Sequence, residues 1–289
     1  MIPWTAVQGY QALMARLRAE ALADLDRILA SVGGESAEVQ VSALMELLPE
    51  LGDKVQGAGD AATATFFQEL QEMQEVPHPI LPDVRDPEGR ASWQALVGWA
   101  SGGRRGESLA QQVASEAFFA LLSGGFTKRL TESAADTMLG NAAAQGGMRY
   151  QRVPAPGCCS FCGMLASRGA AYRSRESASQ VVGRGMSLEE YWARRWAHGK
   201  GPGKSGKWRG GQAGGIKPRG SRALGQPFHD NCMCRAVAVR DGESVEMGSQ
   251  AHVWLDAYRK AAGVAKTSVG EGPMSDRIVK EMDRILTPA

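Results

Sequence analysis

All five cysteines of this 289-residue chain lie in two short segments that are far apart in the sequence. The first segment, residues 157–162, reads Gly-Cys-Cys-Ser-Phe-Cys, and the second, residues 228–234, reads Phe-His-Asp-Asn-Cys-Met-Cys. A C-x2-C turn can present two thiolates to one ion, and a second pair from a distant part of the chain completes a tetrahedron, for which zinc is the usual ion. The sequence therefore predicts a fold in which the two segments meet around a metal ion.

In the first segment, Cys159 and Cys162 have the chelating spacing and are the predicted ligands. Cys158 is the immediate neighbour of Cys159, so its side chain would point elsewhere, and it is not assigned to the site. Two alternatives to a metal site are a set of reduced, buried thiols and a single disulfide. The start of the chain, residues 1–4, lacks the basic and apolar regions of a secretory leader, which disfavours the disulfide.

The second segment offers His229, Cys232 and Cys234 as the remaining candidate ligands. His229 and Cys232 form an H-x2-C pair. If the segment runs as a strand, Cys232 and Cys234 share a face, because side chains alternate with a period of two. The sequence leaves two ligand sets open: three cysteines together with His229, or four cysteines without it.

Four protein ligands would fill the tetrahedron and leave no position for water or substrate, so we expect a structural zinc ion in a protein that is not an enzyme. The sequence contains no H-E-x-x-H or G-x-S-x-G motif, and His229 lacks the adjacent glutamate of the zinc deaminases. The alternative is a zinc-dependent enzyme, such as a nuclease or a toxin-like hydrolase. A metal clip across a long loop is thermodynamically reasonable, because the entropy of loop closure grows only logarithmically with length.

A basic run separates the two cysteine segments, although the net charge of the whole chain is only +2. No acidic residue interrupts the sequence between Glu190 and Asp230, and Gly, Pro and Ser fill residues 199–222, which predicts a surface loop. Such a loop could contact DNA phosphates without reading sequence, as in a sequence-independent DNA-binding protein, or it could be solvated without a partner. The candidate nucleic-acid-binding residues are Arg194, Arg195, Lys200, Lys204, Lys207, Arg209, Lys217, Arg219 and Arg222.

The N-terminal half shows helical periodicity. Apolar residues at three- and four-residue steps predict a helix over 5–32, ended by the glycine pair at 33–34. A second helix is expected from a cap at Ser36, with a kink or stop at Pro49 and a new start near Asp60. Closely spaced prolines predict a linker over 76–88.

Residues 89–145 read as three more helices, the second ended by Gly124-Gly125 and the third capped by Thr127. Strands are expected at 148–153 and 235–239, and a short helix at 187–197. Two C-terminal helices are expected, with a flexible link from Gly263 to Pro273 and a cap at Ser275. No segment approaches the roughly 20 apolar residues of a membrane span.

These elements predict an α+β protein, with a helical N-terminal region followed by a small mixed β domain that is stapled by zinc. The expected organisation is 1–75 helical, 76–88 linker, 89–147 helical, 148–240 zinc-stapled domain containing the basic loop, and 241–289 helical tail.

Between Arg149 and Val239, a C-x2-C motif is followed by Met-Leu-Ala-Ser-Arg-Gly-Ala-Ala-Tyr at 164–172 and closed by F-H-x-x-C-x-C. This combination resembles the MuF-like minor capsid, or head morphogenesis, proteins of tailed phages, in the form found in phages that infect actinobacteria. The closing motif of that family often reads H-P-N-C-R-C, whereas Asp230 and Met233 stand here in place of Pro and Arg. Neither departure removes a candidate ligand.

The resemblance implies a structural protein of low copy number in the phage head, close to the portal. Its implied partners are the portal protein, the major capsid protein and, through the basic loop, packaged DNA. A membrane and a small-molecule substrate are not expected. The implied location is the interior of the virion head, after assembly in the host cytoplasm.

Overall fold

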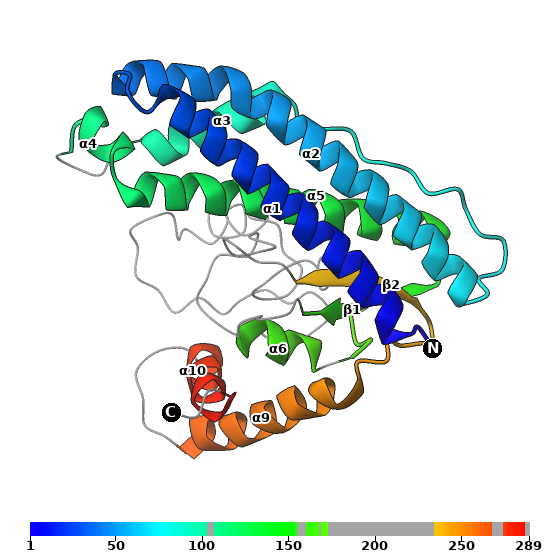
Figure 1. Cartoon of the computed structure of the whole chain (residues 1–289). Coiled ribbons are helices and arrows are strands. Elements are labelled where there is room, and N and C mark those ends of the chain that lie inside the picture. Colours follow the sequence, from blue (N-terminus) through cyan, green and yellow to red (C-terminus); the bar gives the residue numbers. More distant parts are fainter. Residues whose placement is uncertain (103–106, 155–159, 168, 173–233, 268–273, 287–289) are drawn as a thin grey trace, which may run out of the picture. The chain divides into compact units, whose positions relative to one another are not determined.

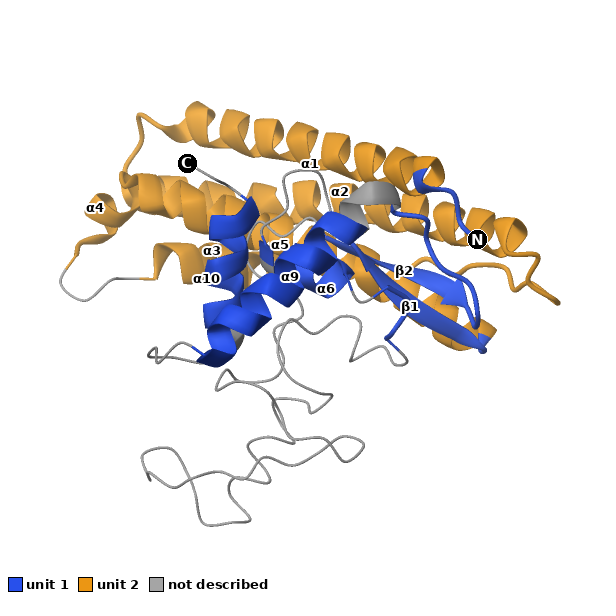
Figure 2. Cartoon of the chain, turned by 90° about the horizontal axis from the view of Figure 1, so that it is seen from below, with its two compact units in different colours: residues 1–4, 146–229, 234–289 blue, residues 5–145, 230–233 orange. Residues whose placement is uncertain are grey.

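The computed structural model describes residues 1–102, 107–154, 160–167, 169–172, 234–267 and 274–286 (Figure 1). These residues fall into two compact units (Figure 2). The helical unit comprises residues 5–145. The sheet unit comprises residues 1–4 and the described residues after 145. Both sides of the segment predicted as a linker, 76–88, therefore belong to one unit.

The first two helices of the helical unit are long. Helix α1 spans Trp4–Val32 and buries the face predicted from its periodicity, which includes Val7, Tyr10, Met14 and Leu25. Helix α2 spans Ala37–Met73 and begins at the predicted cap, where the Ser36 hydroxyl accepts a hydrogen bond from the Val39 N–H.

The prediction that the second helix could stop at Pro49 and start again near Asp60 is wrong, because α2 continues from Ala37 through Pro49 to Met73. Proline removes one backbone hydrogen bond and disfavours a helix interior. Here Leu44, Leu48 and Leu51, on both sides of the proline, are buried in the same apolar core. Burial of these side chains outweighs the local preference.

Three further helices complete the unit: α3 Arg90–Ser101, α4 Leu109–Val113 and α5 Glu116–Gln145. The predicted break at Gly124-Gly125 is wrong, since both glycines are buried inside α5. A Cβ atom at Gly125 would lie 2.3 Å from a methyl carbon of Leu96, so this glycine permits the close approach of α3. Thr127, predicted as a cap, is likewise buried within α5.

The core of the helical unit forms where α2, α3 and α5 pack together. Trp93 is fully buried, lies 5.2 Å from Phe126 between ring centroids, and donates its indole N–H to Asp53 over 2.7 Å. Tyr10 of α1 stacks on Phe66 of α2. Helix α5 ends before Gly146 and Gly147, which adopt positive φ angles of 70° and 62° that glycine tolerates best.

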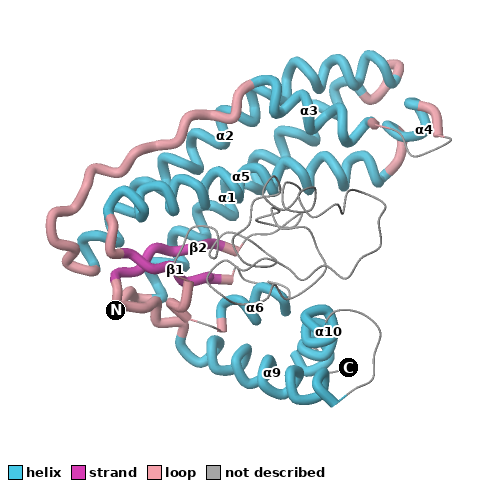
Figure 3. The backbone as a smooth tube through the Cα atoms, turned by 180° about the vertical axis from the view of Figure 1, so that it is seen from behind, coloured by secondary structure: helices cyan, strands magenta, loops and turns pink. Residues whose placement is uncertain are grey.

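The sheet unit is built on strands β1 (Met148–Val153) and β2 (Arg235–Arg240), which pair antiparallel (Figure 3). The helices of this unit within the described residues are α6 Ser160–Ala166, α9 Gly248–Thr267 and α10 Met274–Leu286. Helix α9 continues into the segment predicted as a flexible link from Gly263, and α10 begins before the predicted cap, Ser275. The mostly helical chain with a small antiparallel sheet confirms the α+β class.

The predicted helix at 187–197 lies outside the described residues. Among the helices that the structure does describe, none combines the length and the apolar character needed to cross a membrane.

Candidate metal centre

The pairing of β1 with β2 brings together the strand ends that flank the two cysteine segments. The register runs from Met148 opposite Arg240 to Val153 opposite Arg235. The Cα atoms of such opposed residues lie about 4.5–5.5 Å apart in an antiparallel pair. The chain therefore leaves β1 toward the first cysteine segment at the same end of the sheet at which it returns from the second segment, through Cys234, into β2.

Cys162 lies in the first turn of α6 and is 3% exposed. The helix is held by close packing, because a Cβ atom at Gly163 would lie 2.8 Å from the Trp254 indole of α9. Met164 and Leu165 add apolar contacts in the core that α6 shares with α9 and α10. The residues that follow Cys162 thus fix the position of the helix that carries it.

Tyr172 ties α6 to β1. Its hydroxyl donates to the Leu165 carbonyl over 2.9 Å. Its backbone exchanges two hydrogen bonds with Tyr150 of β1, with N–O distances of 2.9 and 3.3 Å. Tyr172, the last residue of the segment 164–172 that resembles the MuF-like proteins, therefore connects the helix that carries Cys162 to strand β1.

Cys234 lies directly before β2 and is also 3% exposed. Alternation along the strand places it on the same face as Ala236, which is opposite Arg152 in the sheet. Neither Cys162 nor Cys234 forms a disulfide within the described residues. Two of the five predicted ligands are therefore buried cysteines, and Cys234 lies directly at the sheet end where β2 begins.

Two buried arginines, Arg152 and Arg235, stand at this end of the sheet and are 2% and 3% exposed. They occupy opposite faces, because Arg152 pairs with Ala236 whereas Arg235 pairs with Val153. Within the described part of the chain, the Arg235 Nη1 atom has no hydrogen-bond partner. Burial of a guanidinium is costly without a compensating negative charge.

The donor set fits zinc on this observation. A zinc ion with three thiolates and one imidazole carries a net charge of −1, and four thiolates give −2. Either centre is an anion, and of the two buried guanidinium groups that of Arg152 lies on the same face of the sheet as Cys234 and complements it. Neither arginine was singled out from the sequence. For Arg235 the signal that could have found it is a charged residue at the start of the apolar run Ala-Val-Ala-Val at 236–239, whereas β1 contains other polar residues and offers no such signal for Arg152.

The other predicted site residues lie outside the described residues. These are the ligand candidates Cys159, His229 and Cys232, the unassigned Cys158, and the nine basic residues from Arg194 to Arg222. In the ranges that the structure does describe, no three His, Cys, Asp or Glu side chains gather closely enough to hold a metal ion.

Two carboxyl groups with raised pKa values lie in the helical unit. Burial raises the pKa of Asp60, which is 1% exposed and accepts a hydrogen bond of 2.5 Å from the Ser133 hydroxyl. Burial also raises the pKa of Glu132 on α5 to about 7, against the opposing effect of Lys128. Sequence reasoning missed both groups, because their burial depends on how α2 and α5 pack.

The family model described as VG15 protein matches residues 1–199. The chain belongs to the VG15 family. This is a family of phage proteins, which confirms the expected phage context at that coarser level. The VG15 match includes the helical unit, β1, α6 and the first cysteine segment, and it ends before the second cysteine segment. No curated protein and no solved structure matches the chain.

Proposed function

We propose that this VG15 protein is a structural minor capsid protein of a tailed phage, which acts at the portal and the inner shell during head assembly. Membership of a phage protein family supports the context. The paired cysteine motifs, which resemble those of MuF-like head morphogenesis proteins, supply the specific role. On this proposal the protein assembles with the portal and major capsid proteins in the host cytoplasm and remains inside the virion head.

The observation that supports the proposal is the register of β1 and β2, because the Val153–Arg235 pair brings together the strand ends from which the chain enters the first cysteine segment and leaves the second. Cys159 and Cys162 from the first segment, with two of His229, Cys232 and Cys234 from the second, would hold one zinc ion. The ion, when bound, cross-links the two segments and fills its coordination sphere with protein ligands. This chemistry favours a staple rather than a reaction centre.

The described residues prepare this staple. Trp254 and Gly163 fix α6, and Tyr172 fixes α6 to β1. Arg152 contributes a buried positive charge on the same face of the sheet as Cys234. The basic residues between Arg194 and Arg222 would then extend from the stapled domain and contact packaged DNA through its phosphates, without selecting a sequence.

Quantitative mass spectrometry of purified phage particles tests the role in the head. A copy number close to that of the portal subunit, or a small multiple of it, is the expected result. If the protein is absent from mature particles, procapsids are assayed next, because an assembly factor is lost on maturation. Absence from both particle types would contradict the proposed function and favour the zinc-enzyme alternative.

A further inference from the structure

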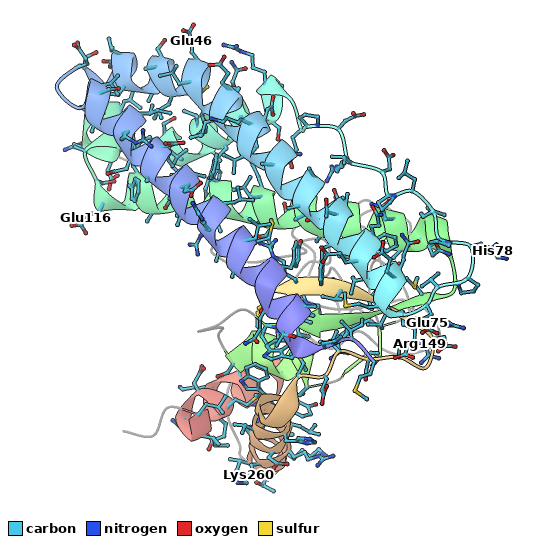
Figure 4. All side chains as sticks on the ribbon, turned by 45° about the vertical axis from the view of Figure 1, so that its right-hand side comes forward. Glu46, Glu75, His78, Glu116, Arg149 and Lys260 are labelled. Atoms are coloured by element: carbon cyan, nitrogen blue, oxygen red, sulfur yellow. The ribbon has the colours of Figure 1, made fainter. Side chains whose placement is uncertain are left out.

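A long non-helical segment, which we term the strap, occupies residues 74–89 between α2 and α3 (Figure 3). Connections between packed helices are usually about 2–8 residues long, and longer ones without secondary structure are mostly functional. The strap begins with a reversal in which Glu75 and His78 adopt φ angles of 47° and 54°, a region that residues other than glycine seldom occupy. Figure 4 shows both residues at the turn that follows α2.

Buried carboxamide side chains hold the backbone of the strap at two points. The Gln71 side chain of α2 binds both the N–H and the C=O of Ile80, each over 3.0 Å, and Gln145 of α5 also accepts from the Ile80 N–H. The Asn141 side chain of α5 binds both backbone groups of Asp83, over 2.7 and 2.8 Å. At Ile80 and Asp83, side chains of α2 and α5 thus bond to the backbone N–H and C=O groups that a neighbouring strand would bond in a sheet.

Three further contacts hold the rest of the strap. Arg85 pairs with Asp136 over 2.5 Å, and Glu88 pairs with Arg129 over 2.6 Å. The Glu88 N–H donates to Gln56 over 3.4 Å. From Gln71 to Gln56, α2 rises about 23 Å, and the strap covers this length from Ile80 to Glu88 at about 2.8 Å per residue, close to the rise of a polyproline helix.

This extended path explains the length of the strap, but not the side chains that it exposes. Leu81 lies between the two anchored residues Ile80 and Asp83 and is 87% exposed, the largest exposed fraction among the large apolar side chains of the described residues. Val84 is 43% exposed. Asp83 and Asp86 are exposed beside them, and no ion pair involves either carboxylate within the described ranges.

We infer that the strap is a docking surface for a protein partner with an apolar pocket, rimmed by basic side chains, that takes Leu81. An extended segment whose backbone is already fixed loses little conformational entropy on binding. More of the free energy gained by burying its exposed side chains therefore appears as binding affinity. Asp83 and Asp86 complement lysine or arginine at the rim. The inference rests on the proposed head-assembly function and places the partner among the head proteins.

The test uses the full-length protein, with the purified portal subunit and the purified major capsid subunit of the same phage as probes. The wild-type protein is expected to bind one of them, and Leu81→Ala is expected to weaken this binding at least about tenfold, as loss of a buried leucine does. Asp86→Lys is expected to weaken it about threefold or more, with less effect at high salt. Leu47→Ala, at an α2 leucine that is 41% exposed, is the matched control and should bind as the wild type does.

The outcomes separate the two proposals. Wild-type binding that Leu81→Ala leaves unchanged would overturn the strap as docking surface while leaving the head-assembly function standing. Binding of neither probe would overturn both. Self-association that Leu81→Ala abolishes would make a second copy of this chain the occupant and overturn a heterologous partner. Because Leu81 is almost fully exposed, we expect Leu81→Ala to have the same unfolding temperature as the wild type. Thermal unfolding that shows this excludes a folding defect as the cause of weaker binding.

Discussion

The helical unit and the sheet unit differ in what can hold them together. In the helical unit, α2, α3 and α5 share a core that includes Trp93, Phe126 and several leucines, and hydrogen bonds from Trp93 to Asp53 and from Ser133 to Asp60 link its helices. In the described part of the sheet unit, the sheet has two strands and the helices share a smaller core rich in alanine. An isolated two-stranded sheet is marginal in water. The comparison teaches that the helical unit is stabilised by burial, and it motivates the zinc cross-link that we propose at the strand ends of the sheet unit.

Loss of the proposed zinc staple should produce the largest difference between the units. We expect Cys162→Ser to lose the metal and to unfold the sheet unit, because structural zinc contributes on the order of 10 kcal/mol. The helical unit should keep its protection from hydrogen exchange. Metal analysis with peptide-resolved hydrogen exchange measures both effects. Cys158→Ser is the matched control and should retain about one zinc ion per chain. A wild-type protein purified without zinc would contradict the staple.

The reverse experiment targets the core of the helical unit. Trp93→Ala should destabilise that unit by about 3–5 kcal/mol, because it removes a fully buried indole that also donates a hydrogen bond to Asp53. Chemical denaturation, with peptide-resolved hydrogen exchange as the probe, measures the loss of unfolding free energy in the helical unit. The zinc content should not change, and a loss of zinc in this variant would show that the two units do not hold themselves together independently.

The stability of the helical unit should also depend on pH through Glu132. Its folded-state pKa of about 7 lies above the ordinary value of 4.5, so the folded state favours the protonated carboxyl. The resulting stabilisation is complete below pH 4.5 and is lost as the pH rises through 7, by at most about 3 kcal/mol. Lys128 and Arg129 oppose this effect, whereas Glu88 and Asp136 add to it.

Glu132→Gln tests this dependence, because glutamine keeps the shape of the protonated side chain without a titrating proton. Urea denaturation at pH 5 and at pH 8 should show a smaller loss of helical-unit stability in the variant than in the wild type. Equal losses in the two proteins would assign the pH dependence to other groups, such as Asp60, whose pKa is also raised by burial.

The smallest effect on stability is expected from deletion of residues 199–222. A segment filled with Gly, Pro and Ser cannot bury a core, so its loss should cost less than about 1 kcal/mol in either unit. Any DNA affinity of the protein should fall, together with its dependence on salt. Filter binding at two salt concentrations and thermal unfolding measure the two properties. Unfolding of the deletion variant would show that this segment is part of the fold.

The sequence by itself determined the features that depend on neighbouring residues along the chain. The apolar stripe of α1, the cap at Ser36, the stop at Gly146-Gly147 and the two strands all follow from local periodicity and backbone preference. The cysteine spacing likewise predicts that two distant segments converge, and the register of β1 and β2 brings together the strand ends that flank them.

The tertiary structure alone decided which local signals would be overridden. Pro49 and Gly125 both carry the signature of a helix break, yet burial against α3 and the core keeps α2 and α5 continuous. The prolines of the strap predicted an extended segment, but not the amide side chains of Gln71 and Asn141 that hold it. Burial of Glu132 and Arg235 is decided in the same way. The physical reason is that periodicity reports what one segment prefers, whereas burial and hydrogen-bond partners depend on side chains contributed by segments far away in the sequence.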